Sequence, residues 1–378
     1  MAALNEEQTL LKDQASAWVS AEAPVAKFRA MRNEGKEAAF AQPTWAAMVE
    51  MGWTGILIPE EFGGSDLGYL TFGVVLEELG KQLTASPLFA SAYVGASALM
   101  LAGSKAQKSE LLPKIVDGSA IVTLALEEGA RHAPLQTKLK AAADGDHFTL
   151  TGTKTLVLEG MTATHFIVVA RTNGKAGDVN GLSLFVVPAD AKGLGRTAMK
   201  TMDSRGYAEL QLDGVKVPSS ALMGPADQAG EVLDEILDRA RAGLGAEMLG
   251  VGAQSFAMTL DYLKTRKQFG AVIGSFQALG HRAAELFSAM ELARSCGEAA
   301  LQELDGQSNN VAKACSLSKA KVGDFLHEMS NQLIQIHGGI GMTDEFDAGL
   351  YLKRARVLEG LYGTPAFHRD RYARLLGF

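Results

Sequence analysis

The sequence predicts a mainly α-helical protein with a β domain at its centre, and three observations support this. Residues 226–364 contain no proline. Proline disrupts helix interiors, so a stretch of this length that is rich in Ala, Leu, Glu and Lys indicates a bundle of long helices. Residues 121–224 carry short apolar runs between turn residues, whereas residues 1–120 space their apolar residues as helices do. We therefore expect domains over residues 1–120, 121–224 and 225–378.

The first domain is expected to be helical. Asn5 is a plausible N-cap, and Gln8 stands three residues later, as a capping box requires. Leu10, Leu11 and Trp18 then keep one apolar face at helical spacing. A turn-rich break over residues 56–64 separates an earlier helix from later ones. The further expected helices are 44–51, 69–79, 89–101 and 106–116.

The second domain is expected to be an antiparallel β structure. Its strands follow one another without an intervening helical pattern, which does not fit the alternating strands and helices of a Rossmann fold. Asp213-Gly214 is a hairpin-turn dipeptide. The expected strands are 121–126, 147–152, 166–171, 182–188 and 208–212.

Charge and composition exclude several classes of function. The 378 residues carry a formal net charge of −7, which argues against nucleic acid as a partner. No apolar run is long enough for a membrane span, and the first residues lack the basic and apolar regions of a signal peptide. The two cysteines, Cys296 and Cys315, suggest a reducing compartment, so we expect a cytoplasmic protein. The seven histidines lack metal-binding spacing, and we expect no metal site.

Two glycine-bearing segments lie in the third domain: Arg266-Lys267-Gln268-Phe269-Gly270, which we expect to end a helix, and Gln335-Ile336-His337-Gly338-Gly339-Ile340-Gly341. Glycine is unfavourable within a helix, so such segments mark helix ends or the close approach of another group. Both segments can be simple helix caps. Alternatively, Arg266 and the glycine-rich end meet an anionic cofactor.

With these segments the chain resembles the acyl-CoA dehydrogenase family over nearly its whole length. Further similar segments are Met51–Ile56 with Pro59–Gly64, Leu150–Lys154, Asp213–Pro218 and Ser275-Phe276-Gln277. The resemblance implies an N-terminal α domain, an antiparallel β-barrel or sandwich, and a C-terminal four-helix bundle. It also implies α,β-dehydrogenation of an acyl-CoA thioester by FAD, an electron-transfer flavoprotein as electron acceptor, and a homo- or hetero-tetramer.

The resemblance also implies roles for individual residues. Arg266, Gln268 and Phe269 would contact the phosphates and adenosine of FAD. Gln335, Gly338 and Gly339 would bind its adenylate side, and all six would serve the FAD of a neighbouring subunit. Leu126 and Leu158 take positions beside the subunit's own flavin. The substrate-binding positions are Arg241 and Tyr362.

The chain departs from the family pattern at the catalytic base. Tyr362 stands where the family has its usual glutamate, and Ala240 stands at the alternative position used by some members. Glu359 comes three residues too early and should point elsewhere. Near the flavin, Leu126-Glu127-Glu128 replaces a Thr-Glu-Pro segment, His132 replaces a serine and Leu158 replaces a threonine.

Three interpretations remain open. The chain is a non-catalytic or FAD-completing subunit whose partner supplies the glutamate. Alternatively, it acts alone with an unrecognised base such as Glu127, Glu159 or Glu247. In the third interpretation it binds an acyl-CoA or a partner without catalysis. A tyrosine has a pKa near 10 in the absence of perturbation, so Tyr362 is a poor base and more simply a packing residue that lines the acyl pocket.

Overall fold

The computed structural model describes residues 4–35 and 40–378. Met1–Ala3, part of the segment inspected for a signal peptide, lie outside the described residues. The chain forms two compact units. The bundle unit comprises the chain up to Arg29, Tyr69–Thr84 and Arg241–Phe378, and the sheet unit comprises Ala30–Gly68 and Ala85–Ala240.

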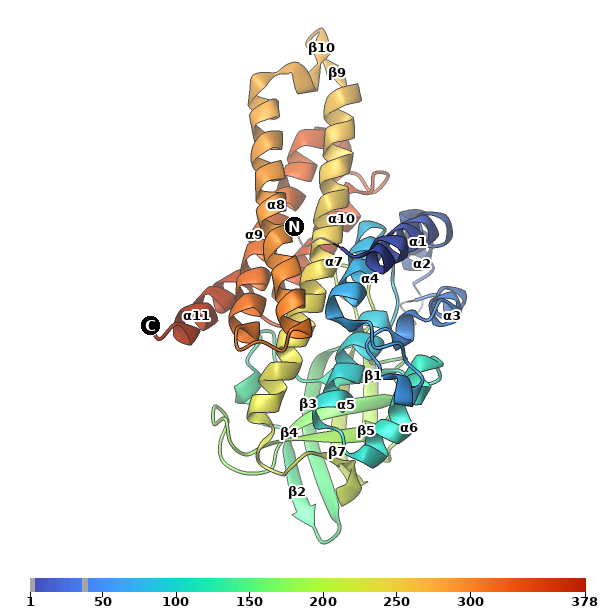
Figure 1. Ribbon diagram of the computed structural model, residues 1–378, viewed down its shortest axis with the longest axis vertical. Helices are drawn as coiled ribbons and strands as arrows, with labels where there is room; N and C mark the ends of the chain where they lie inside the picture. The colour runs from blue at the N-terminus through green and yellow to red at the C-terminus, as the bar shows by residue number, and fades with distance from the viewer. Residues whose placement is uncertain (1–3, 36–39) are drawn as a thin grey trace. The chain divides into compact units, whose positions relative to one another are not determined.

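The bundle unit is built from long helices. The linker between α7 and α8 carries the short hairpin β9–β10 at the far end of both helices (Figure 1). Helix α7 begins in the sheet unit and continues through the bundle unit without interruption. The elements are α1 (Glu6–Glu22), α4 (Gly68–Lys81), α7 (Ala229–Thr265), β9 (Lys267–Gln268), β10 (Ala271–Val272), α8 (Gln277–Asp305), α9 (Val311–His337), α10 (Ala348–Gly360) and α11 (Pro365–Leu375).

The expected start of the first helix is confirmed. The Asn5 side chain accepts the Gln8 backbone N–H at 2.8 Å, and the Gln8 side chain accepts the Asn5 N–H at 3.1 Å. This reciprocal capping box satisfies two donors that the helix itself leaves unpaired.

Helices α4 and α7 cross at very short range. A Cβ on Gly250 of α7 would lie 1.9 Å from the carbonyl oxygen of Glu77, and one on Gly80 of α4 would lie 2.4 Å from that of Glu247. Only glycine permits this crossing, because any other side chain would overlap the opposite backbone. The Glu77 carboxylate also receives Arg294 Nη1 of α8 at 2.7 Å, which ties a third helix to the pair.

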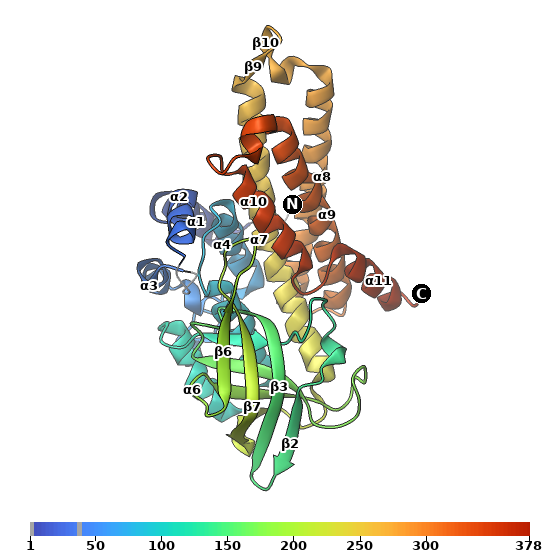
Figure 2. The ribbon, with the colours of Figure 1, turned by 180° about the vertical axis from the view of Figure 1, so that it is seen from behind.

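The sheet unit contains an eight-stranded mixed sheet with the path β6-β7-β3-β2-β4-β5-β8, to which β1 adds by pairing with β4. Figure 2 shows β6, β7 and β3 side by side. The sheet is mostly antiparallel, as expected, but β1 runs parallel to β4, and β2 meets β4 in parallel at one position. The strands are β1 (Val122–Ala125), β2 (Lys140–Asp144), β3 (His147–Leu158), β4 (His165–Arg171), β5 (Leu182–Pro188), β6 (Leu194–Met199), β7 (Tyr207–Pro218) and β8 (Leu222–Met223).

The hairpin predicted at Asp213-Gly214 is wrong. Both residues lie inside β7, which continues to Pro218. The register against β3 shifts between Leu150 and Gly152, opposite this dipeptide. Gly214 has φ +63°, so its freedom to adopt a left-handed conformation serves a β-bulge rather than a turn.

Helical segments pack on the sheet. The 89–101 helix is observed as a π-helical turn, η3 (Leu88–Gly95), followed by α5 (Ala96–Ala102). A Cβ on Gly95 would lie 2.3 Å from the carbonyl oxygen of Val122, so this segment lies directly against β1. The remaining helices are α2 (Val25–Glu34), which begins in the bundle unit, α3 (Gln42–Glu50) and α6 (Lys105–Val116). Across residues 4–35 and 40–378, no helix is both long and apolar enough to cross a membrane.

Candidate functional site

The first candidate segment forms an exposed tip on the bundle unit. Helix α7 ends at Thr265, and Arg266 leads into the β9–β10 hairpin. Phe269 is 91% exposed at φ +53°, and Gly270 follows with φ +79°. The Phe269 ring meets Phe276 edge to face, with 6.3 Å between the ring centroids, and is otherwise open to solvent.

The second candidate segment lies at the same end of the bundle. The ring of Tyr262 on α7 stacks on His337 at 4.3 Å between centroids, and its hydroxyl donates to the His337 carbonyl at 3.4 Å. Leu263, Ile273 and Ile336 form the apolar cluster beneath. The fold therefore brings together two segments that are about 70 residues apart in the chain. Gly338 and Gly339 have open space where a Cβ would stand, so another group can approach their backbone.

The third candidate segment is the loop after α10, where the family glutamate is replaced. Tyr362 is buried in the left-handed region at φ +52°. The loop is held by its carbonyl groups: Lys319 Nζ donates to Leu358, Glu359 and Gly363 at 3.0, 3.1 and 3.0 Å. The first two carbonyls close the C-terminus of α10, where a cation also complements the helix dipole. Burial lowers the pKa of Lys319 to about 7, although Glu359 opposes the shift.

Two further groups hold the carbonyl of Tyr362. Arg241 Nε donates to it at 3.4 Å, and His368 Nε2 donates to it at 3.0 Å. Burial, followed by Arg241 and Lys319, lowers the pKa of His368 to about 2, so this imidazole is neutral. The structure thus brings Arg241 and Tyr362 together. Their observed contact is through the backbone of Tyr362. Ala240 is a buried methyl group on α7.

Most of the carboxylates considered as bases are engaged elsewhere. Glu247 Oε1 accepts Arg354 Nη2 at 2.6 Å and Nε at 2.9 Å in a buried pair. Glu159 is buried in the turn after β3. Glu359 pairs with Arg356 at 2.5 Å and with His327 at 3.0 Å. Glu127 lines a cavity, and its Oε1 contacts His132 Nδ1 at 2.6 Å.

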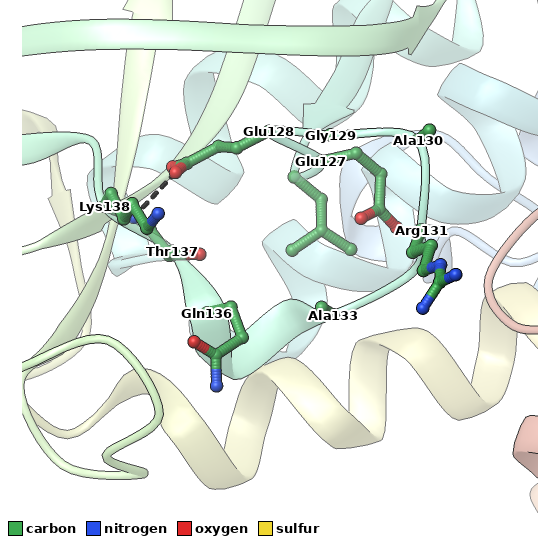
Figure 3. A pocket seen from close by; sticks show the side chains of 10 residues that line it. Glu127, Glu128, Gly129, Ala130, Arg131, Ala133, Gln136, Thr137 and Lys138 are labelled. Atoms are coloured by element: carbon green, nitrogen blue, oxygen red, sulfur yellow. Dashed lines mark hydrogen bonds between the residues drawn. The ribbon is translucent and has the colours of Figure 1, made fainter.

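That cavity, of about 330 Å³, is open to solvent and is lined by ten residues between Leu126 and Lys138 of the sheet unit (Figure 3). The Glu128 carboxylate joins the two ends of this segment. Its oxygens accept the backbone N–H groups of Lys138 and Leu139 at 2.7 and 2.9 Å and the ammonium of Lys154 at 2.8 Å. Lys154 is completely buried, and this burial lowers its pKa to about 8 against the opposing effect of Glu128.

Comparison with known proteins defines the family. The models of the N-terminal, middle and C-terminal domains of acyl-CoA dehydrogenases match residues 5–119, 126–215 and 230–377. A probable acyl-CoA dehydrogenase of Bacillus subtilis, YngJ, is 32% identical over 89% of this chain and 90% of its own length. The chain belongs to the acyl-CoA dehydrogenase family, so the family and the fold predicted from the sequence are confirmed.

Two solved structures are also similar. A Tcur3481-Tcur3483 steroid ACAD variant has 30% identity and a TM-score of 0.89, with 98% of both chains covered. The ChsE4-ChsE5 complex of Mycobacterium tuberculosis has 27% identity and a TM-score of 0.89, with 99% of this chain and 98% of that chain covered.

FAD is the cofactor of this family. The exposed tip at Arg266–Gly270 and the sheet-unit positions Leu126 and Leu158 differ in how well they suit it. The exposed tip fits: it offers the Arg266 cation, an exposed ring, and glycine backbone open to approach. The sheet-unit positions fit poorly. Leu126 and Leu158 are buried apolar side chains with no hydroxyl to donate, and Glu128 stands where the family has a proline. Sequence reasoning missed Lys319, Lys154 and His368, whose importance arises from burial that no local pattern reveals.

Proposed function

We propose that this chain is the FAD-completing subunit of an acyl-CoA dehydrogenase that oxidises the Cα–Cβ bond of an acyl-CoA thioester together with an unlike partner chain. The observation that carries the proposal is the absence of a carboxylate at both family base positions, Tyr362 and Ala240, in a chain that keeps Arg266 on an exposed tip. A positioned base must remove the α-proton. The partner supplies it.

The roles then divide between the two chains. When bound, FAD would supply the acceptor for the hydride from the β-carbon of the substrate. In this chain, Arg266, Gln268 and Phe269 contact the diphosphate and adenosine of the partner's FAD, and Gln335, Gly338 and Gly339 flank the adenylate. Arg241 and the Tyr362 loop shape a substrate-binding region. An electron-transfer flavoprotein takes the electrons from the reduced assembly.

The two solved relatives support an unlike partner, since each is described by the names of two components, and one is called a complex. We therefore favour a hetero-tetramer over a homo-tetramer. Because the Tcur3481-Tcur3483 relative is a steroid ACAD, steroid acyl-CoA thioesters are the first substrates to test.

The decisive experiment compares this chain alone with the chain co-expressed with a family member that carries the glutamate, to be sought first among the adjacent genes. We expect little flavin absorbance and no dye reduction with acyl-CoA from the chain alone, and both from the co-purified assembly. A full flavin complement and acyl-CoA-dependent dye reduction by the chain alone would overturn the proposal.

A tip variant tests the role of Arg266 within the assembly. Loss of a charge-assisted hydrogen bond costs about 1.5–3 kcal/mol, so Arg266→Ala should weaken FAD binding about 10- to 150-fold. The matched control is Lys264→Ala, which removes an exposed cation two residues earlier in α7. If both variants retain the same flavin content, the phosphate role of Arg266 is wrong.

A further inference from the structure

The connection between β4 and β5 contains both Asn-Gly dipeptides of the sequence, Asn173-Gly174 and Asn180-Gly181. Asparagine is thermolabile, because its side-chain amide is open to attack by the backbone nitrogen of the next residue. Glycine in the next position leaves this approach unobstructed, since it has no side chain. The two dipeptides are alike in sequence, so their surroundings in the fold determine which of them reacts.

The first dipeptide is arranged for this attack. The backbone nitrogen of Gly174 lies 2.8 Å from Oδ1 of Asn173, so the attacking atom already contacts the amide group. Both residues are exposed, which gives water access to the reaction. The turn also requires glycine here, because Gly174 has φ +67° and a Cβ on it would lie 2.9 Å from the carboxylate of Asp178. The fold thus presents the two reacting groups to each other and to solvent.

The second dipeptide is held away from the same reaction. Gly181 is buried, and its N–H donates to the carbonyl of Asp227 at 2.7 Å. The carbonyl of Asn180 accepts Nη1 of Arg171 at 2.9 Å in a charge-assisted bond. Attack at Asn180 requires the nitrogen of Gly181 to lose the proton that it donates, and it requires rotation of a peptide group that Arg171 holds. Both requirements slow the reaction at Asn180 relative to Asn173.

The connection that carries Asn173 is joined to the wall of the cavity of about 330 Å³. The N–H of Gly177 and Nη2 of Arg171 both donate to the carbonyl of Leu135, at 2.8 Å each. Leu135 directly precedes Gln136, which lines the cavity (Figure 3). A change in the shape of this connection therefore reaches the cavity wall.

Asn173 lies at the base of the connection. Its N–H donates to the carbonyl of Gly181 at 3.2 Å, and the N–H of Thr172 donates to the same carbonyl at 2.9 Å. The carbonyl of Asn173 packs against Gly181, where a Cβ would lie 2.0 Å from that oxygen. Isoaspartate at this position routes the main chain through the former side chain and lengthens it by one methylene group. These close contacts do not survive such a change.

We propose that Asn173 is a deamidation site and that its conversion to isoaspartate loosens residues 172–181 from the cavity wall. The nitrogen of Gly174 loses its proton and forms a bond to Cγ of Asn173, the Cγ–Nδ2 bond breaks, and ammonia leaves with that proton. Water then adds to the resulting cyclic imide and opens it to aspartate or isoaspartate. The net reaction consumes one water and releases one ammonia, without oxidant or reductant. The inference does not depend on the proposed function.

The first test ages the purified chain at mildly alkaline pH and maps deamidation by proteolysis and mass spectrometry. We expect Asn173 to be converted at least ten times faster than Asn180 in the folded chain. In urea the fold no longer distinguishes the two dipeptides, so their rates should become similar. Equal rates in the folded chain, or a faster Asn180, would overturn the proposal. A tenfold ratio that persists in urea would assign the difference to sequence and contradict the structural argument.

The second test separates the two sites with matched variants. Asn173→Gln keeps an amide but places it one methylene group further from the attacking nitrogen, so it should remove most of the isoaspartate that forms on ageing. Methyl transfer by a protein-isoaspartate methyltransferase measures that quantity. The control is Asn180→Gln, which should leave it unchanged. A greater loss in Asn180→Gln than in Asn173→Gln contradicts the proposal.

The third test measures the loosening by hydrogen exchange over residues 172–181. We expect aged wild-type chain with isoaspartate at position 173 to exchange the Gly177 amide at least ten times faster than fresh chain. Fresh Asn173→Asp carries the charge of the product without the added methylene group, and it should exchange like fresh wild type. Unchanged exchange in the aged chain, or equally fast exchange in fresh Asn173→Asp, would overturn the loosening by isoaspartate.

Discussion

The ammonium group of Lys319 lies 3.0 Å from the carbonyl oxygen of Gly363, the residue that follows Tyr362. This bond, with two others to the end of α10, gives the loop at the family's catalytic position a fixed backbone although its usual glutamate is absent. The loop conformation is therefore maintained by Lys319 of helix α9 and not by the side chain at position 362.

The first prediction concerns Lys319. Lys319→Met leaves three carbonyls without their donor, and each unsatisfied buried acceptor costs about 1–3 kcal/mol, so we expect the free energy of unfolding at pH 7 to fall by at least that amount. Urea denaturation measures it. The control is Lys321→Met, an exposed lysine on the same helix. Equal stability of the two variants would contradict the proposed role.

The pH dependence of the same comparison has a defined sign. The pKa of Lys319 is lowered in the folded state to about 7 from 10.5, so between these values the unfolded chain binds more protons. The contribution of Lys319 to the free energy of unfolding therefore rises with pH across this window. Wild type should gain stability relative to Lys319→Met from pH 7 to pH 10. The pKa of Lys154 is also lowered, but Lys154 is present in both proteins, so its contribution to the pH dependence cancels in the comparison.

The second prediction concerns His368 in acid. Its folded-state pKa is lowered to about 2 from 6.5, so the neutral imidazole contributes stability that is present above pH 6.5 and is lost progressively as the pH falls below it. His368→Gln keeps a donor for the Tyr362 carbonyl but does not titrate. Its stability should decline less between pH 6.5 and 4 than that of wild type. The exposed His281→Gln variant should follow the wild-type curve.

The third prediction concerns Tyr362. Tyr362→Phe should leave the activity of the assembly unchanged within about twofold, because Arg241 and His368 hold the backbone carbonyl, which phenylalanine retains. Tyr362→Glu should also add no activity, since Leu126 and Leu158 stand where the family has hydroxyl donors beside the subunit's own flavin. A large loss in Tyr362→Phe would instead assign chemistry to the phenol.

The fourth prediction separates structure from catalysis at Glu247. Glu247→Gln leaves the buried Arg354 without its charge partner, and breaking such a pair costs about 3–5 kcal/mol. We expect a much lower melting temperature for the variant. If Glu247 were the base, the folded fraction of the variant would have no turnover, whereas a purely structural role leaves the turnover of the folded fraction unchanged, so measuring both quantities distinguishes the roles. Glu247→Gln/Arg354→Met should recover part of the lost stability.

The fifth prediction concerns the α4–α7 crossing. Gly250→Ala places a methyl group 1.9 Å from the Glu77 carbonyl oxygen, and overpacking of this kind costs about 1–3 kcal/mol or more. Gly280→Ala on α8 has open space around the new methyl group and should be neutral or stabilising by up to about 1 kcal/mol. Thermal unfolding of the two variants should shift in different directions or by clearly different amounts.

Sequence reasoning could use patterns formed by residues that are close together in the chain. The Asn5–Gln8 capping box involves residues three apart, and it was predicted correctly. The Asp213-Gly214 hairpin was not, because the same dipeptide serves a bulge when β3 continues opposite it. The ion pair Glu128–Lys154 joins residues that are 26 positions apart in the chain, and the pair Glu247–Arg354 joins residues that are 107 positions apart. Such partners are chosen by the tertiary fold, so no spacing rule could identify them.

Helix α7 fixes the distance between Arg241 and the tip that follows Thr265. From Arg241 to its last residue, Thr265, the helix advances 24 residues without a break, which at about 1.5 Å per residue is about 36 Å. The buried Arg241 and the exposed tip therefore lie at two separate places along one continuous helix. A one-residue insertion between them would rotate the tip by about 100° relative to Arg241, which makes the length of this helix as constrained as any residue it carries.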